Sequence, residues 1–73
     1  MKRLRAERLR RRLSQPRLAA ASGIPQTTIS AIERGRIVPN ARELARLAAF
    51  LDISNPDDLL RDVQLLPVEE VVQ

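Results

Sequence analysis

A chain of 73 residues without cysteine or histidine cannot use disulfides or the usual zinc ligands to hold a small core together. The same absences remove the bases that activate serine, threonine and cysteine nucleophiles, so the composition predicts no enzyme, no cofactor and no metal site. The net charge of +4 conceals a basic half, because residues 1–46 hold twelve of the thirteen basic side chains and only three of the nine acidic ones, which indicates a polyanionic partner.

Two helices are predicted before the first glycine. Segment 2–13 is rich in arginine, and four apolar positions place one side of it against a core: Leu4, Ala6, Leu9 and Leu13. Ser14 then serves as the N-cap of a second helix over residues 15–22, in which Pro16 is acceptable within the first turn. Gly23 ends this helix, because glycine readily adopts the positive φ that a tight turn requires.

A third helix, from about Pro25 to Arg34, completes a motif with the second. The small and apolar residues that would pack these two helices together have the spacing of a helix-turn-helix: Leu18, Ala19, Gly23, Ile29 and Ile32. Once these positions point inward, four residues are left on the outward side of the third helix: Gln26, Thr27, Ser30 and Arg34. A helix built only to fill a core has no need of such a polar first turn.

Two more helices are predicted in the second half of the chain. Asn40 caps a helix over residues 41–51, and Glu43 can bond back as the other half of a capping box. The apolar face of this helix follows the helical period: Leu44, Leu47, Ala48 and Leu51. Asn55 opens a short fifth helix to about Gln64, with a proline at its first position and acids in its first turn.

The segments LSQPRLAAASGIPQTTISAIERGR and PNARELARLAAFLDI resemble the Cro and phage-repressor family of helix-turn-helix domains, often called XRE-like. The resemblance covers about residues 3–60 and implies an all-α, compact, five-helix, lambda-repressor-like DNA-binding domain over residues 1–64. In this family the second helix of the motif enters the major groove of DNA. Two positions depart from the family's pattern: Arg12 stands where glycine is common, and Pro25 stands where Ser or Thr usually caps the recognition helix.

The resemblance also implies roles for individual side chains. Gln26, Thr27 and Ser30 become candidate base readers, with Thr28 and Ala31 beside them. Gln15 corresponds to the glutamine that braces the recognition helix and touches the DNA backbone in the family, and Arg8 and Glu33 correspond to a structural ion pair found in many members.

The chemistry of these side chains agrees with the resemblance. Glutamine can bond bidentately to adenine, and the methyl group of threonine can pack on the methyl group of thymine. Arginines on either side of the recognition helix would neutralise phosphates, namely Arg17, Arg34, Arg36 and Arg42. The expected partner is therefore double-stranded DNA.

The last nine residues, 65–73, read LLPVEEVVQ and are both apolar and acidic. We expect a dimerisation segment here, because one short reading helix needs a second copy to reach useful specificity. The candidates for this contact are Leu59, Leu65, Leu66, Val68, Val71 and Val72. A frayed end is the alternative, and VEEVV could also pair as a short strand across a dimer.

These observations predict a homodimeric, cytoplasmic transcriptional repressor, nucleoid-associated in a prokaryote or encoded by a phage, that reads a pseudo-palindromic operator. No stretch approaches the ~20 apolar residues of a membrane span, so no membrane partner is expected. Two alternatives stay open. An antitoxin or controller protein of the same fold would bind a partner protein through residues 55–73. A protein-interaction adaptor or an anionic-membrane binder would instead use the arginines of the first helix.

Overall fold

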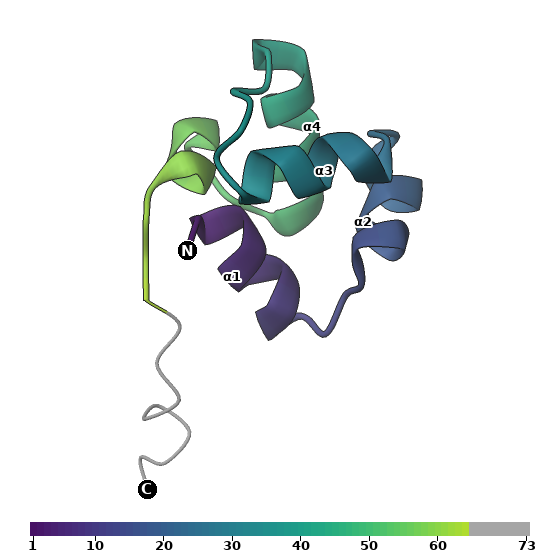
Figure 1. Cartoon of the computed structure of the whole chain (residues 1–73), viewed down its shortest axis with the longest axis horizontal. Coiled ribbons are helices and arrows are strands. Elements are labelled where there is room, and N and C mark those ends of the chain that lie inside the picture. The colour runs from purple at the N-terminus through teal and green to yellow at the C-terminus, as the bar shows by residue number, and fades with distance from the viewer. Residues whose placement is uncertain (65–73) are drawn as a thin grey trace, which may run out of the picture.

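The computed structural model describes residues 1–64, which form four α-helices and one 3-10 helix around a single core (Figure 1). The elements are α1 (Arg3–Arg10), α2 (Gln15–Ser22), α3 (Gln26–Glu33), α4 (Ala41–Leu51) and the 3-10 helix η1 (Pro56–Leu60). Over these residues the fold is all-helical, as predicted. No helix among them is long and apolar enough to cross a membrane.

The fifth predicted helix is a 3-10 helix that ends at Leu60 rather than an α-helix that continues to Gln64. The cause is a contact between the two ends of the described chain. The backbone of Arg61 turns extended, and its carbonyl oxygen accepts a hydrogen bond from Arg3 N–H at 2.8 Å. Val63 N–H then donates to the Met1 carbonyl oxygen at 2.7 Å. Pairing with the N-terminal residues therefore replaces further helix.

The core draws apolar side chains from all five elements. Its fully buried large members come from α1 (Leu4), α2 (Leu18), the α2–α3 turn (Ile24), α3 (Ile29, Ile32), α4 (Leu47, Leu51) and η1 (Leu59). Two expectations about leucines are wrong. Leu9 was expected on the buried stripe of the first helix but is 36% exposed, and Leu59 was expected at a dimer surface but is fully buried. Leu59 therefore stabilises the fold and is not available to a second chain.

Helix α1 ends at Arg10, before the predicted end at Leu13, and the turn that follows contains a residue with a left-handed backbone conformation. Arg12 has a φ of 57°, in the position where the resemblance leads us to expect glycine. Leu13 N–H donates to the Arg8 carbonyl oxygen at 3.0 Å, and Arg12 N–H donates to that of Leu9 at 2.9 Å. This pair of bonds is a Schellman motif, so the end of α1 is well bonded although no glycine is present.

The turn between α2 and α3 depends on Gly23, which has a φ of 75°. A side chain at this position would meet only the end of Arg46 at 3.7 Å, an ordinary contact, so backbone conformation and not crowding requires glycine here. Ser14 caps α2 as predicted, since its Oγ accepts from Arg17 N–H at 3.1 Å. The tight turn lays α3 across the front of the molecule in Figure 1, beside α2 and above α1.

Helix α4 begins with the predicted capping box. Asn40 Oδ1 accepts from Glu43 N–H at 2.8 Å, and Glu43 Oε1 accepts from Asn40 N–H at 3.1 Å. The first turn of α4 is therefore fixed by local chemistry. The buried leucines of α4 belong to the same hydrophobic core as the apolar residues of α2 and α3.

Candidate nucleic-acid interface

Helix α3 turns its isoleucines into the core and its short polar side chains outward. Ile29 and Ile32 are fully buried, as predicted, because residues three apart lie on the same face of a helix. Gln26 and Thr27 are exposed in the first turn, and Ser30 is half-buried one turn later. Pro25 occupies the N-cap position before α3 and gives the helix no side-chain cap, since proline has no side-chain acceptor.

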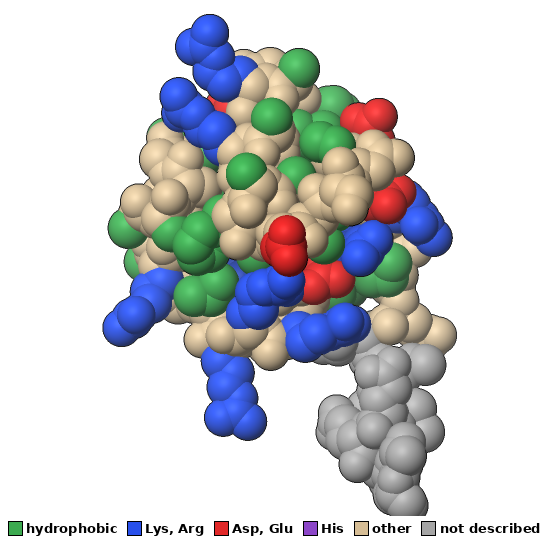
Figure 2. Space-filling view, turned by 180° about the vertical axis from the view of Figure 1, so that it is seen from behind, with side chains coloured by type: hydrophobic (Ala, Val, Ile, Leu, Met, Phe, Trp, Pro, Cys, Tyr) green, Lys and Arg blue, Asp and Glu red, His purple; other side chains and the backbone are tan. Residues whose placement is uncertain are grey.

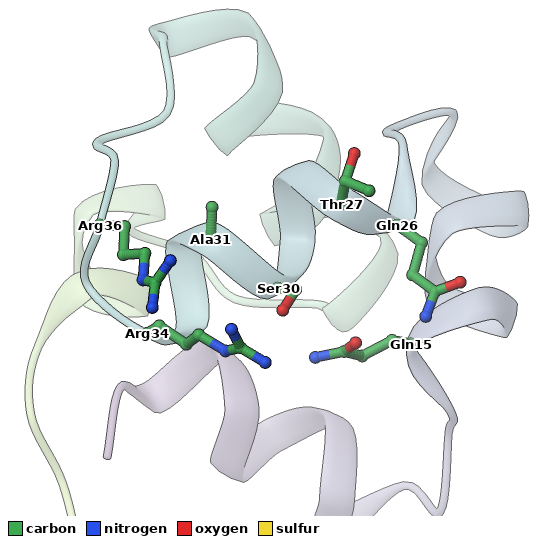
Figure 3. Close-up of a pocket in the computed structure, with 7 residues that line it drawn as sticks. All are labelled: Gln15, Gln26, Thr27, Ser30, Ala31, Arg34 and Arg36. Carbon is green, nitrogen blue, oxygen red and sulfur yellow. The ribbon is translucent and has the colours of Figure 1, made fainter.

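The outward side chains of α3 line an open hollow of about 420 Å³, hereafter the α3 hollow. Its lining residues are Gln15, Gln26, Thr27, Ser30, Ala31, Arg34 and Arg36 (Figure 3). Gln15 and Arg34 point toward each other on either side of Ser30 (Figure 3). The hollow therefore combines short polar groups along α3 with amide and guanidinium groups at its edges.

Behind the α3 hollow, the carboxylate of Glu33 connects three helices. Arg8 of α1 donates to it twice, from Nε to Oε2 at 2.8 Å and from Nη2 to Oε1 at 3.0 Å. Gln15 of α2 donates from Nε2 to Oε1 at 3.1 Å. Arg8 also donates from Nη1 to the carbonyl oxygen of Leu13 at 2.8 Å. We call Arg8, Gln15 and Glu33 the Glu33 cluster; it fixes the end of α3 against α1 and α2.

The positive charge of the α3 hollow comes from two arginines that remain unneutralised. Among residues 1–64, neither Arg34 nor Arg36 forms an ion pair. The nearest carboxylate in sequence belongs to Glu33, whose side chain is only 3% exposed and is already paired with Arg8. The hollow therefore presents two free cations beside donors and acceptors, which suits a phosphate-bearing ligand.

Residues 4–59 of the chain match the helix-turn-helix family model of the XRE and Cro type. The chain belongs to this helix-turn-helix family. Members of this family share a DNA-binding regulator domain, and the family is not a family of enzymes. No curated protein and no solved structure matches the chain.

Not every predicted site residue lies in the α3 hollow of this helix-turn-helix domain. Arg17 and Arg42 are exposed on α2 and α4 and do not line it. Thr28 is half-buried and does not line it either, whereas its neighbour Ala31 does. The aliphatic residues of segment 65–73 lie outside the described residues: Leu65, Leu66, Val68, Val71 and Val72.

A second buried carboxylate of the helix-turn-helix domain, Glu7, was missed from the sequence. Arg3 Nε donates to its Oε2 at 3.2 Å, Arg11 Nη1 donates to its Oε1, and Arg10 Nη1 lies 4.0 Å from Oε2. Burial raises the pKa of Glu7, but the hydrogen bonds from Arg11 and Arg3 and the charges of Arg10 and Arg11 outweigh burial and hold this pKa below its usual value. The signal was visible, since Glu7 is the one acid in an arginine-rich helix and has arginine at i−4, i+3 and i+4.

Proposed function

We propose that this chain is a homodimeric transcriptional repressor that reads a pseudo-palindromic operator through the major groove. Residues 1–64 form the DNA-binding domain, and residues 65–73 form a dimerisation segment. The protein acts on prokaryotic or phage DNA in the cytoplasm and represses by occupying its operator. Membership in the helix-turn-helix family supports DNA binding by the chain as a whole.

The proposed base readers are Gln26, Thr27 and Ser30, because they are the polar side chains of α3 that reach the α3 hollow. Gln26 can donate to and accept from the edge of adenine, and Thr27 can pack its methyl group on thymine. Ser30 can donate to or accept from either kind of base edge. Thr28 has the weakest support among the original candidates, because it does not line the hollow.

The proposed backbone contacts are Arg34, Arg36 and Gln15. The two arginines are free of ion pairs within residues 1–64 and lie at the C-terminal end of α3. Gln15 uses one amide hydrogen on Glu33 and keeps a second for a phosphate oxygen. Such contacts supply affinity and position the reading helix without selecting sequence. Arg42 would reach only phosphates farther from α3, and Arg17, which does not line the α3 hollow, is left out of the proposed phosphate contacts.

One observation carries the proposal: two arginines that form no ion pair among residues 1–64 and the exposed polar side chains of α3 share a single open hollow on the outward face of the second motif helix. A helix that served only the core would not gather two free arginines around its exposed polar residues. A homodimer follows from the size of this surface, since one short helix reads few bases and two copies about 34 Å apart would read two successive major grooves.

Selection of bound sequences from random duplex DNA tests the proposal. We expect a consensus with two-fold symmetry, which would report sequence-specific reading and dimerisation together. The absence of any enriched sequence would contradict the reading role. An enriched half-site without symmetry would contradict the homodimer alone.

The phosphate contacts have a separate test in the salt dependence of binding. Arg34→Ala and Arg36→Ala should each weaken binding to every sequence and reduce the slope of log affinity against log salt by about one. Arg5→Ala is the matched control, because Arg5 is exposed on α1, lies outside the α3 hollow and loses the same charge. A slope that changes equally in all three variants would assign the effect to overall charge and remove the two arginines from the contact list.

A further inference from the structure

A second hollow, of about 490 Å³, lies between α2 and α4 and shares no lining residue with the α3 hollow. It is lined by Leu13, Arg17, Ala20, Ala21 and Phe50, and we call it the apolar hollow. Three of these residues follow the i, i+3, i+4 spacing of one face of α2. This face of α2 therefore presents two exposed alanines and one exposed arginine to the hollow.

Phe50 is the feature of the apolar hollow that most needs a partner. It is the only aromatic residue of the chain, and 44% of it is exposed although the core nearby is built from aliphatic side chains. Seen from behind, the molecule carries several hydrophobic side chains at its surface, with basic side chains projecting at its margins (Figure 2). Together with Leu13, Ala20 and Ala21 the ring lines one hollow, so the exposed apolar surface is contiguous and suits a partner.

Arg17 adds an unneutralised charge to the apolar hollow. Among residues 1–64 its side chain forms no ion pair, and its backbone N–H is used only to cap α2 through Ser14. The partner of this surface should therefore be aliphatic and should carry negative charge.

Segment 65–73 of the same sequence has that chemistry. It contains five aliphatic residues and two glutamates and no basic residue. Nine residues can span up to about 30 Å when extended, which is enough to cross from one small domain to another. Its charge is opposite to that of the arginine in the apolar hollow.

We propose that residues 65–73 of a second copy occupy the apolar hollow, with aliphatic side chains against Phe50 and Ala21 and a glutamate facing Arg17. The inference rests on the homodimer of the proposed function and names the surface that the dimer uses. The described chain ends beside α1 and η1, on the side of the molecule away from α2 (Figure 1). Reciprocal exchange between two copies then fills both hollows with one symmetric contact.

Cysteine pairing tests the inference cleanly, because the full chain contains no cysteine of its own. One full-length variant carries Ala21→Cys and a second, distinguishable by mass, carries Val71→Cys. After mixing and mild oxidation, we expect the mixed disulfide to form at least about tenfold faster than in a control mixture of Ala45→Cys with Val71→Cys, because docking raises the effective concentration of the two thiols. Ala45 is exposed on α4 and does not line the apolar hollow.

Equal rates for the two mixtures would overturn the inference. A double variant with both Ala21→Cys and Val71→Cys in one chain should give linked dimers; a cyclised monomer as its main product would also overturn it, since the segment would then fill its own hollow. Ala21→Glu, which places a like charge against the glutamates, should weaken dimerisation about tenfold or more in sedimentation, and an unchanged dimer would contradict the contact. Specific binding of each variant to a half-site duplex reports the proposed DNA reading separately, so failure of the hollow and failure of the function give different results.

Discussion

The helix-turn-helix domain holds two buried carboxylates, Glu7 and Glu33, and their surroundings differ. The side chain of Glu33 is 3% exposed and that of its partner Arg8 is 9% exposed, so both charged groups of this ion pair are removed from water. The side chain of Glu7 is 8% exposed, but its arginine partners are 29% to 60% exposed. The Arg8–Glu33 pair is therefore shielded from water on both sides, whereas Glu7 is a buried acid whose arginine partners remain in contact with water.

The two clusters also connect different parts of the molecule. The Glu33 cluster links α1, α2 and α3 directly behind the proposed reading face. Glu7 and its partners Arg3, Arg10 and Arg11, which we call the Glu7 cluster, lie along α1 and its C-cap. Two of these arginines also reach other elements, since Arg11 Nη2 donates to the Leu51 carbonyl oxygen at 2.6 Å and Arg3 Nη1 donates to Asp58 Oδ2 at 3.5 Å. The comparison teaches that similar ion pairs serve different purposes. One positions the recognition helix, and the other ties α1 to α4 and η1.

The largest effect is expected from breaking the Glu33 cluster. Glu33→Ala leaves the guanidinium of Arg8 buried without its partner, so the free energy of unfolding should fall by about 3–5 kcal/mol, measured by urea denaturation. The double variant Arg8→Met with Glu33→Met should recover part of this loss, because it removes both buried charges. A loss below about 1 kcal/mol in the single variant would show that Arg8 finds another partner or reaches water.

Breaking the Glu7 cluster should cost less. Glu7→Ala leaves arginines that can turn to water, so we expect a loss of about 1–2 kcal/mol in the free energy of unfolding. The affinity of the folded protein for its selected operator should not change, since Glu7 does not line the α3 hollow. A matched fall in operator affinity would contradict the separation of the two clusters.

The Glu7 cluster also predicts a dependence of stability on pH. Because the pKa of Glu7 in the folded protein lies below its ordinary value of 4.5, its contribution to stability is fully present above about pH 4.5 and is lost as pH falls through the lowered pKa. The urea concentration at the midpoint of denaturation should therefore decrease as the pH is lowered below about 4.5 in the parent, and should decrease less steeply in Glu7→Ala. Parallel curves for the two proteins would contradict the assigned ionisation.

The smallest effect concerns the ends of α1 and α3, which have the same type of turn. Gly35 ends α3 with a φ of 75° in the same pattern of hydrogen bonds that Arg12 makes at the end of α1. Arg12→Gly should therefore stabilise the protein by about 1 kcal/mol, because the left-handed backbone strains every residue that has a Cβ. Arg12→Ala is the control: it removes the charge but keeps the Cβ. An equal gain from alanine would assign the effect to charge repulsion among the arginines of α1.

The sequence predicts the parts of this fold that depend on local chemistry. The caps at Ser14 and Asn40 and the turn at Gly23 follow from the residues at those positions. The helical spacing of apolar residues correctly predicted that Ile29 and Ile32 are buried. The ends of α1 and η1 could not be found in this way. They depend on an arginine in a left-handed conformation and on pairing between residues 1–3 and 61–63, which are distant in sequence.

The candidate site follows the same division. The helical spacing of the sequence was enough to predict that Gln26, Thr27 and Ser30 face outward, and all three line the α3 hollow. The hydrogen bond from Gln15 to Glu33 joins residues eighteen apart and depends on how α2 and α3 cross. The position of Arg17 beside Phe50, and not in the α3 hollow, depends on that same packing and on α4.

The most direct test of the central claim compares Gln26→Ala with Arg36→Ala on every single-base variant of the selected operator. If α3 reads bases through its outward face, Gln26→Ala should lose about 1–3 kcal/mol of discrimination at one position of each half-site. Arg36→Ala should weaken all operators alike and keep the parent's order of preference. If Gln26→Ala keeps the parent's preferences at every position, the outward face of α3 does not read DNA as proposed.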